Sequence, residues 1–374
     1  MKQTSLTGIA GPETVVLAGL CTSVHDPVLF ELDIQEMQML CTTAGAQIVQ
    51  TIIQNRVTPE ASTYLGSGKL LEIKAIMDEH QCKTLIIDAE LTPGQIRNIE
   101  KAVEGKVIDR SQLILDIFIK HARTNEAKIQ VELAQLRTLY PRLAHASSHY
   151  SQQVGGIGTT GPGEKQLELD RRLIQKRISD LKQRLEEIDQ NRSTQRKSRQ
   201  AQTNIALVGY TNVGKSSLLN ALCSADVLVA NRLFATLETA TRRTFIPGCG
   251  EITISDTVGF LRKLPHHLVA SFKSTLSVVR EANLLLLVLD GSGLHARTQL
   301  DTVEEVLGEL GAAEVPRLYL LNKMDLVQDA LVRSELLRTF PDAMLISAHS
   351  KEDMKQLKKQ IGSRLNGLGH TLSY

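Results

Sequence analysis

The stretch GYTNVGKS, from Gly209 to Ser216, has the residue types and spacing of a loop that binds nucleotide phosphates. Its two glycines let the backbone approach a phosphate closely, and successive N–H groups would face the phosphate oxygens. Lys215 would neutralise the β and γ phosphates, and the Ser216 hydroxyl would ligate magnesium. A plain glycine turn between a strand and a helix is the competing interpretation. The residues expected to line the phosphate site are Gly209, Asn212, Val213, Gly214, Lys215, Ser216 and Ser217.

A second motif, ISDTVG, predicts the metal side of the same site. It ends an expected strand with Asp256, which would face magnesium through a water molecule, and it turns at Gly259, whose N–H would meet the γ-phosphate. Residues 231–243 lie where a mobile switch is expected. Thr236 is the candidate there for a magnesium ligand, with Thr239 and Thr241 as alternatives and a plain surface loop as the competing interpretation. We expect Lys215, Thr236 and Gly259 to act in hydrolysis, and Ser216 and Thr236 to hold Mg²⁺.

A third motif, NKMD, indicates which base is bound. The Asp325 carboxylate can accept hydrogen bonds from N1–H and the exocyclic amine of guanine, whereas adenine offers no such donor pair. Asn322 would support the base and the loop, with the Lys323 stem along the plane of the base. The tripeptide ISA farther on would place the Ala348 N–H near the guanine O6, while Ser347 steadies the loop. The sequence therefore predicts GTP and GDP as ligands.

Phe260 stands where a GTPase of the Ras kind carries a glutamine that orients the attacking water. A phenyl ring cannot orient water, so we expect slow hydrolysis until a partner completes the site. Arg242 and Arg243 are candidates for stabilising transition-state charge from within the chain.

The elements that must position these motifs follow from the apolar pattern. From Asn204 to near Asn366, short unbroken apolar runs alternate with helical patterns, which predicts a P-loop GTPase domain with a doubly wound, mostly parallel sheet. The first part of the chain alternates in the same way and predicts a small α/β domain. Its expected strands are 14–20, 46–53, 83–88 and KVID, and its expected helices are 33–44, 68–80 and 93–104.

Between these parts, apolar residues recur at helical spacing in two series, which predicts an antiparallel helical hairpin. The break between the series, residues 145–164, contains five glycines and one proline and should not stay helical. Beyond Ile188 the chain is polar and basic, which predicts a helix end and a linker. We expect three domains: an α/β domain over 1–110, the hairpin with its glycine-rich loop and basic linker over 111–200, and the GTPase domain over 201–374.

The composition limits the possible classes of protein. The net charge is +2 over 374 residues, so affinity for nucleic acid must come from a local patch. The five cysteines are scattered without a C-x-x-C pair, as expected for core thiols in a reducing compartment. The first residues lack an apolar signal core, and the longest apolar run, 284–289, is too short to span a bilayer. We expect a cytoplasmic protein without a membrane span, and a monomer.

Several stretches together resemble the HflX family of translational GTPases: FATLETATRR, DTVGFLRKLPHHLVASFKSTL, QVELAQL, GGIGTTGPGEKQLELDRR and YLGSGK. The resemblance covers the chain from about residue 30. It implies a protein that binds the large ribosomal subunit and separates stalled or idle ribosomes in a GTP-dependent manner, often under stress. The family's switch commonly reads D-P-T-T where this chain has Glu238 to Thr241, so the rigidity that proline supplies is not expected. Because 27 residues follow Ser347, we expect the extra C-terminal domain of some members to be missing.

The residues themselves point more weakly to RNA. Residues 165–200 carry eleven Lys or Arg against six Asp or Glu, an excess that suits phosphate contacts. A solvated helical face with internal ion pairs is the competing interpretation. We expect ribosomal RNA to contact residues of about 143–200. The alternatives are a ribosome assembly GTPase, a GTP-dependent switch acting on a protein effector, and an RNA-processing enzyme, for which no second catalytic cluster is evident.

Two other features have ordinary explanations. GSGK, residues 66–69, lacks the spacing of a phosphate loop and predicts the turn before a helix. Asp88 and Glu90 resemble a catalytic carboxylate pair, but they precede an expected helix start and are interpreted as capping or charge–dipole residues.

Overall fold

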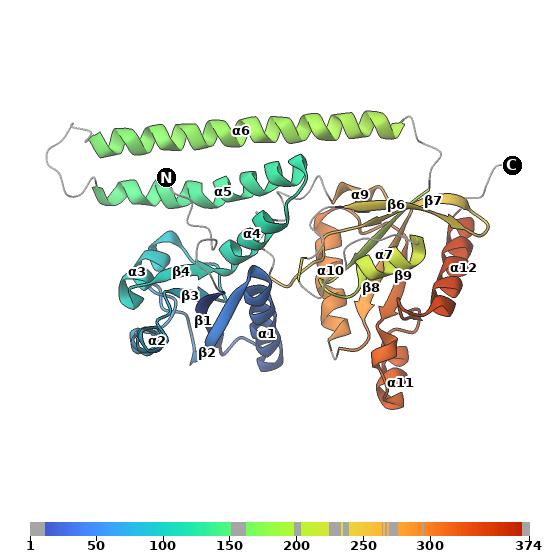
Figure 1. Ribbon diagram of the computed structural model, residues 1–374, viewed down its shortest axis with the longest axis horizontal. Helices are drawn as coiled ribbons and strands as arrows, with labels where there is room; N and C mark the ends of the chain where they lie inside the picture. Colours follow the sequence, from blue (N-terminus) through green and yellow to red (C-terminus); the bar gives the residue numbers. More distant parts are fainter. Residues whose placement is uncertain are drawn as a thin grey trace. The chain divides into compact units, whose positions relative to one another are not determined.

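The computed structural model of the chain describes residues 12–150, 162–197, 203–223, 233–234, 239–263, 265, 268, 276–293 and 295–368. The chain divides into two compact units (Figure 1). The first contains Met1–Lys120 and Lys128–Arg184, and the second contains His121–Ala127 and Leu185–Tyr374. Among the described residues, no helix is both long enough and apolar enough to cross a membrane.

The first unit begins with a parallel four-stranded sheet in the order β2-β1-β3-β4. Its strands are β1 (Glu13–Thr22), β2 (Ala46–Arg56), β3 (Thr84–Ile87) and β4 (Lys106–Asp109). The helices that alternate with them are α1 (Pro27–Ala44), α2 (Ser67–Glu79) and α3 (Pro93–Val103). The predicted small α/β domain is thereby confirmed. The interpretation of GSGK is confirmed for Gly66, which is the N-cap of α2, but it is wrong for Gly68, because the helix already begins at Ser67.

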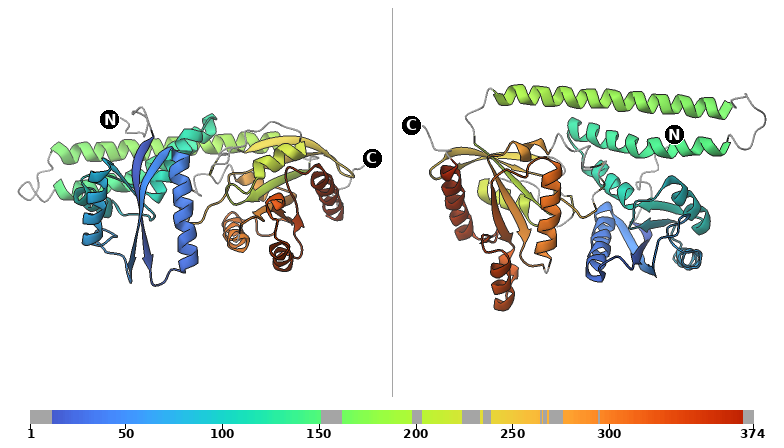
Figure 2. Two further views of the ribbon diagram at one scale, coloured as in Figure 1. Left: turned by 60° about the horizontal axis from the view of Figure 1, so that its bottom comes forward. Right: turned by 180° about the vertical axis from the view of Figure 1, so that it is seen from behind.

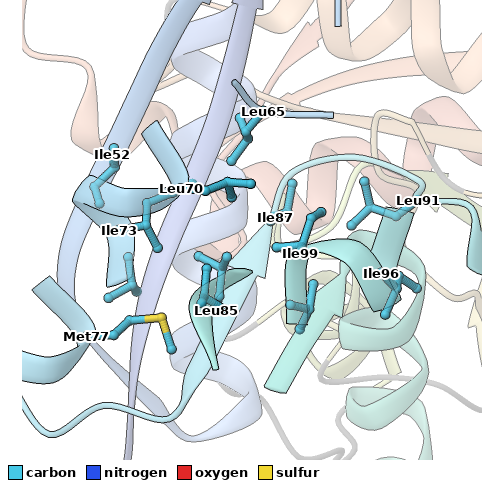
Figure 3. Close-up of a cluster of buried hydrophobic side chains, with 14 of the residues drawn as sticks. Ile52, Leu65, Leu70, Ile73, Met77, Leu85, Ile87, Leu91, Ile96 and Ile99 are labelled. Carbon is cyan, nitrogen blue, oxygen red and sulfur yellow. The ribbon is translucent and has the colours of Figure 1, made fainter. Parts of the chain in front are cut away.

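One face of this sheet packs against α2 and α3 and forms a continuous apolar core, as Figure 3 shows. Each element contributes side chains at its own period, two in the strands and between three and four in the helices. The labelled members are Ile52, Leu65, Leu70, Ile73, Met77, Leu85, Ile87, Leu91, Ile96 and Ile99. A capping box fixes where α3 begins: the Thr92 hydroxyl accepts from the Gln95 N–H, and the Gln95 side chain accepts from the Thr92 N–H.

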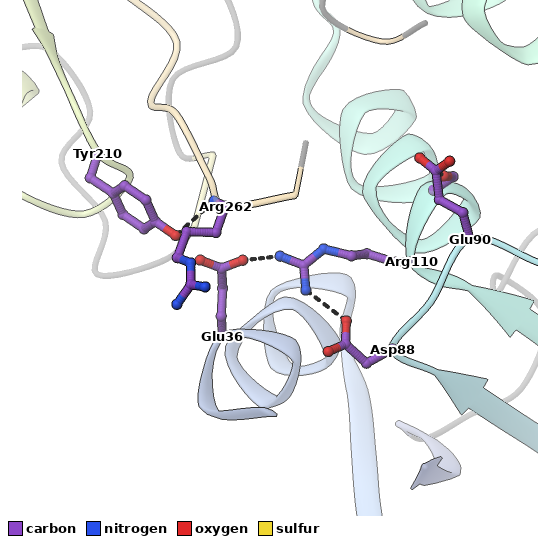
Figure 4. Close-up of polar contacts among 7 residues, drawn as sticks. Glu36, Asp88, Glu90, Arg110, Tyr210 and Arg262 are labelled. Carbon is purple, nitrogen blue, oxygen red and sulfur yellow. Dashed lines mark hydrogen bonds and ion pairs between the residues drawn. The ribbon is translucent and has the colours of Figure 1, made fainter. Parts of the chain in front are cut away.

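The interpretation of Asp88 as a capping residue is wrong, because its carboxylate lies in a buried ion-pair cluster. Arg110, which is 1% exposed, donates to Asp88 over 2.7 Å and to Glu36 of α1 (Figure 4). Glu90 lies apart from this pair, 3.4 Å from the Ser111 hydroxyl. Cap formation at α3 needs no carboxylate, since Thr92 already supplies the acceptor.

The middle of the chain forms three helices: α4 (Arg110–His121), α5 (Asn125–Tyr150) and α6 (Pro162–Lys197). Helices α5 and α6 lie side by side as the predicted antiparallel hairpin (Figures 1 and 2). Among the described side chains, Arg177 of α6 makes a bidentate ion pair with Glu132 of α5, at 2.7 and 3.0 Å, and the Arg171 guanidinium lies 5.6 Å from the centre of the Tyr140 ring.

Three expected ends of the hairpin helices are wrong. Helix α5 continues through 145–150, and α6 begins at Pro162 and continues past Ile188 to Lys197. Ala, Ser, His, Gln, Arg and Lys carry only small helix penalties, so polar stretches of these residues extend a helix that is already formed. Proline is also favoured in the first turn of a helix, which explains the start at Pro162. The rest of the glycine-rich loop, 151–161, lies outside the described residues.

The second unit contains a six-stranded sheet in the order β10-β9-β8-β5-β7-β6, with helices on both sides (Figures 1 and 2). All neighbouring strands are parallel except β6 and β7. The strands are β5 (Asn204–Gly209), β6 (Ala240–Ile246), β7 (Gly250–Asp256), β8 (Leu284–Asp290), β9 (Arg317–Asn322) and β10 (Met344–Leu345). The helices are α7 (Lys215–Cys223), α9 (Ser277–Arg280), α10 (Ala296–Glu309), α11 (Ala330–Thr339) and α12 (Lys351–Gly367), with a short 3₁₀ helix at Met324–Leu326. The predicted doubly wound sheet is confirmed.

Candidate nucleotide site

The predicted phosphate loop joins β5 to α7 at the carboxyl end of the sheet. Its glycines are required by close contacts. A Cβ added to Gly209 would lie 2.2 Å from the Val288 carbonyl oxygen, and one added to Gly214, where φ is +94°, would lie 2.4 Å from Nδ2 of Asn322. The loop therefore has the tight backbone that a phosphate cradle needs, and its N–H groups lead into the N-terminus of α7.

Lys215 is held inside this loop and is only 6% exposed. Its ammonium donates to the carbonyl oxygens of Gly209, over 3.2 Å, and Tyr210, over 2.7 Å. Burial lowers the pKa of Lys215 to about 8, although the nearby charge of Asp256 acts in the opposite direction. In the nucleotide-bound protein, the Lys215 ammonium would donate to a charged phosphate oxygen instead of to these two neutral carbonyl oxygens.

Ser216 and Asp256 meet at the metal side of the site. The Ser216 hydroxyl donates to Oδ2 of Asp256 over 2.6 Å, and Asp256 is fully buried at the end of β7. A hydroxyl and a carboxylate are both hard oxygen donors, so the pair fits magnesium, which usually takes few protein ligands and completes its shell with phosphate and water. Within the described residues no group of three or more His, Cys, Asp or Glu could hold a metal without such outside ligands.

The predicted γ-phosphate turn lies directly on the phosphate loop. A Cβ added to Gly259 would lie 2.7 Å from Cα of Thr211 and 2.9 Å from Nζ of Lys215. The next residue, Phe260, is 2% exposed and forms a parallel β-bridge with Tyr210. Because Asp256 aligns with Leu207, the four steps from Asp256 to Phe260 run beside three steps of the neighbouring chain. The turn thus contains one extra residue, as a β-bulge does.

Thr211, in the phosphate loop, has a buried hydroxyl without a hydrogen-bond partner among the described residues. The residue is 6% exposed. A buried hydroxyl without a partner is costly, and in native proteins it commonly has a ligand or water partner. The unpartnered Thr211 hydroxyl therefore indicates, independently of the sequence motifs, that a polar ligand binds at this loop.

The predicted base-recognition residues come together at the ends of β9 and β10. Asn322 donates to the Val213 carbonyl over 2.9 Å and accepts from the Ala348 N–H over 3.0 Å, so it connects three loops. A hydrogen bond from the Ser347 side chain lowers the pKa of the exposed Asp325 carboxyl. Asp325 is therefore ionised at neutral pH and can accept hydrogen bonds. Lys323 lies beside it in a left-handed conformation, with its ammonium 2.7 Å from Asp290.

The other predicted residues have different positions. Ser217 follows Ser216 in the first turn of α7. Thr236 lies outside the described residues. Thr241 lies in β6, where its hydroxyl is 2.9 Å from that of Ser255, and Thr239 precedes that strand. Arg242 and Arg243 are exposed on β6, where Arg242 donates to the Thr241 carbonyl and Arg243 lies 3.8 Å from Glu251. The hydroxyl of Thr241 thus contacts the sheet rather than the phosphate loop.

Sequence reasoning missed two residues at this site. Asp290 anchors Lys323, and its position at the carboxyl end of a parallel strand was an available signal. Tyr210 carries a buried ring whose hydroxyl accepts from the Arg262 N–H over 2.8 Å (Figure 4). It occupies a variable position of the motif, which gives no hint of such a contact.

Three family models match the chain: GTP-binding GTPase N-terminal at 31–119, GTP-binding GTPase Middle Region at 121–199, and 50S ribosome-binding GTPase at 204–323. The first two cover most of the first unit and of the hairpin, and the third covers the phosphate loop and ends at Lys323, the second residue of NKMD.

Similar proteins cover almost the whole chain. GTPase HflX of Flavobacterium psychrophilum is 40% identical over 93% of this chain and 89% of the relative. GTPase HflX of Escherichia coli is 42% identical over 91% of this chain and 81% of the relative, and that of Alkalihalophilus pseudofirmus 42% identical over 95% and 84%. Among solved structures, the complex of SsGBP with GDP is 27% identical, covers 95% of this chain and 99% of that one, and has a TM-score of 0.52. The chain therefore belongs to the HflX family of GTPases, and it binds and hydrolyses GTP.

Proposed function

We propose that the protein binds the large ribosomal subunit in its GTP-bound state and separates stalled or idle ribosomes into subunits, with hydrolysis releasing it afterwards. The family match carries this proposal, because it includes the middle region and a GTPase model described as 50S ribosome-binding. The function would place the protein in the cytoplasm and give it a use under stress, when stalled ribosomes accumulate.

The three predicted domains would divide the work. The hairpin within 111–200 would enter the subunit and contact ribosomal RNA, and the domain over 201–374 would bind GTP with Mg²⁺ held by Ser216 and Thr236. The hairpin suits a probe. Helix α6 has 36 residues and is therefore about 54 Å long, and the Glu132–Arg177 ion pair joins it to α5. The domain over 1–110 would support the base of the hairpin through α4.

Slow hydrolysis in the absence of ribosomes completes the proposal. Phe260 supplies no polar group to orient water, and its ring is buried. The subunit would then have to order residues 231–243 or supply the missing groups. A factor of this kind remains in the GTP state until it has reached its partner, which is the timing that splitting requires.

Sucrose-gradient centrifugation tests the proposal directly. Intact ribosomes are incubated with the protein and GTP, GDP or a non-hydrolysable GTP analogue. We expect separated subunits with GTP and with the analogue, the protein retained on the large subunit with the analogue, and no change with GDP. The Lys215→Ala variant, which lacks the phosphate-binding ammonium, serves as the inactive control. Ribosomes that stay intact in every nucleotide would refute splitting.

A charge-exchange experiment tests the role of the hairpin separately. Arg177→Glu places two carboxylates opposite each other between α5 and α6, and we expect ribosome splitting to fall while GTP turnover without ribosomes stays unchanged. The double variant Glu132→Arg, Arg177→Glu restores an ion pair with reversed polarity and should recover much of the splitting. If the double variant stayed as defective as the single one, contact of Arg177 with RNA rather than stiffness of the hairpin would explain the loss.

The same gradients discriminate the alternative functions. A ribosome assembly GTPase would bind isolated or immature large subunits and leave intact ribosomes unchanged. A switch with a protein effector would not sediment with ribosomal particles in any nucleotide state.

A further inference from the structure

Backbone hydrogen bonds attach the turn after Asp256 to the phosphate loop. The Thr211 N–H donates to the Phe260 carbonyl over 2.8 Å, and the Phe260 N–H donates to the Gly209 carbonyl over 3.1 Å. These two hydrogen bonds continue the parallel pairing of β5 and β7 past the ends of both strands. The phosphate loop and the turn that should sense the γ-phosphate are therefore paired to each other by backbone bonds.

The pairing brings Gly259 close to the phosphate loop. Gly259 lies so close to Thr211 and Lys215 that a single added carbon would contact both within 3 Å. Lys215 meanwhile donates to the carbonyls of Gly209 and Tyr210. A γ-phosphate must lie between the Lys215 ammonium and the Gly259 N–H, so its space is filled in this conformation. The α and β phosphates, which lie farther along the loop toward α7, do not compete with Gly259.

The Tyr210 side chain helps to hold this pairing in place. Tyr210 contacts the turn at two points, through its backbone bridge to Phe260 and through its hydroxyl, which accepts the Arg262 N–H over 2.8 Å. The ring is buried, so this hydrogen bond is shielded from competing water. Tyr210 thereby holds residues 260–262 along the loop, although its ring lies at a variable position of the motif.

We propose that Tyr210 is a positioning residue that sets the preference between GTP and GDP, because its hydroxyl stabilises a conformation that admits a diphosphate and excludes the third phosphate. GTP binds only when the Thr211–Phe260 pairing opens, and a ligand's affinity is reduced by the fraction of molecules that are closed. GDP binds the open and closed conformations equally and therefore does not shift the equilibrium between them. The proposal concerns the GTPase site alone and does not depend on ribosome binding.

The test is the Tyr210→Phe variant of the full chain, which keeps the ring and removes only the hydroxyl. Binding of GDP and of a non-hydrolysable GTP analogue is measured by fluorescence of methylanthraniloyl-labelled nucleotides. We expect affinity for the analogue to rise roughly fivefold, the weight of one hydrogen bond, and GDP affinity to stay within about twofold. Tyr319→Phe is the matched control, since it removes another hydroxyl of the same domain, bonded to Glu304, and should leave the ratio of the two affinities unchanged.

Hydrogen exchange supplies a second readout that a purely structural role would not produce. In nucleotide-free protein, the amides of Thr211 and Arg262 should exchange faster in Tyr210→Phe than in the unmodified chain, while the β8 amides stay protected equally. The analogue, but not GDP, should produce the same local acceleration at Thr211 in the unmodified chain. Equal shifts in GDP and analogue affinity, or unchanged exchange at Arg262, would overturn the proposal.

Discussion

The side chain of Asn322 connects the Val213 carbonyl and the Ala348 N–H, at 2.9 and 3.0 Å, and so holds the phosphate loop and the two base-recognition loops as one body. Both its polar atoms are used, and the residue is buried at the end of β9. The geometry that orients the guanine ring is thereby linked to the geometry that orients the phosphates, whichever nucleotide is present.

Replacing Asn322 should lower the affinities for GTP and GDP equally. For Asn322→Ala we expect GTP and GDP affinities to fall together by roughly 10- to 100-fold, because a buried carbonyl and a buried N–H lose their partners. Labelled-nucleotide binding measures both constants. Asn98→Ala is the control, since Asn98 makes a similar bond to the Ser62 carbonyl in the other unit. A change in the ratio of the two affinities would contradict a purely connecting role.

Nucleotide binding should take up a proton in alkaline solution. Because burial lowers the pKa of Lys215 to about 8, its amine is largely neutral in the free protein above that pH, whereas phosphates favour the charged form. Affinity should therefore be constant below pH 8 and fall as the pH rises above it. Calorimetry at pH 8.5 in two buffers of different ionisation enthalpy, with excess magnesium, should show uptake of most of one proton. Equal heats in the two buffers would show that Lys215 is already charged.

The cluster around Arg110 should be a large contributor to the stability of the first unit. Arg110→Ala leaves Asp88 and Glu36 buried without their cation, so we expect a loss of about 3–5 kcal/mol. Urea unfolding, followed by hydrogen exchange of β1 and β3, measures it. Arg172→Ala is the matched control: Arg172 pairs with Glu168 at 2.6 Å, but the two side chains are 73% and 59% exposed. That change should cost less than about 1 kcal/mol.

Removing the orphaned hydroxyl of Thr211 should stabilise the nucleotide-free protein. Valine has the same shape, so Thr211→Val removes a buried polar atom without a partner and should raise the free energy of unfolding by about 1 kcal/mol. Thr244→Val is the control, because the Thr244 hydroxyl donates to the Leu222 carbonyl over 2.9 Å and its loss should destabilise. Urea unfolding of both variants without nucleotide measures the difference. Equal destabilisation in the two would mean that Thr211 has a partner.

The parts of the site that could be predicted from the sequence are those that depend on a few adjacent residues. Gly209 to Ser216 encodes its own loop, and NKMD marks the end of a strand, so the position of each followed once the parallel sheet was inferred. The roles assigned to these residues stay predictions until nucleotide is bound. Thr236 stays one too, because it lies outside the described residues.

What could not be predicted depends on contacts between distant residues. No residue near Asp88 in the sequence indicates that Arg110 pairs with it, and the position of Asp88 before a helix favours a capping role instead. The ends of α5 and α6 were misplaced because glycine and proline mark possible ends of a helix, whereas packing of the hairpin decides how far each helix continues. The Tyr210–Arg262 bond joins positions 52 residues apart, neither of which belongs to a fixed motif position.

The extra residue between Asp256 and Phe260 has a mechanical consequence. The extra residue lets the turn change its backbone conformation. Gly259 can therefore move toward or away from the phosphate loop while Asp256 stays paired with Leu207 in the sheet. Such a movement of the turn would need no shift of β5 against β7. The backbone of 257–262 would then differ between the GTP-bound and GDP-bound protein, and a macromolecule that contacts this segment could distinguish the two states.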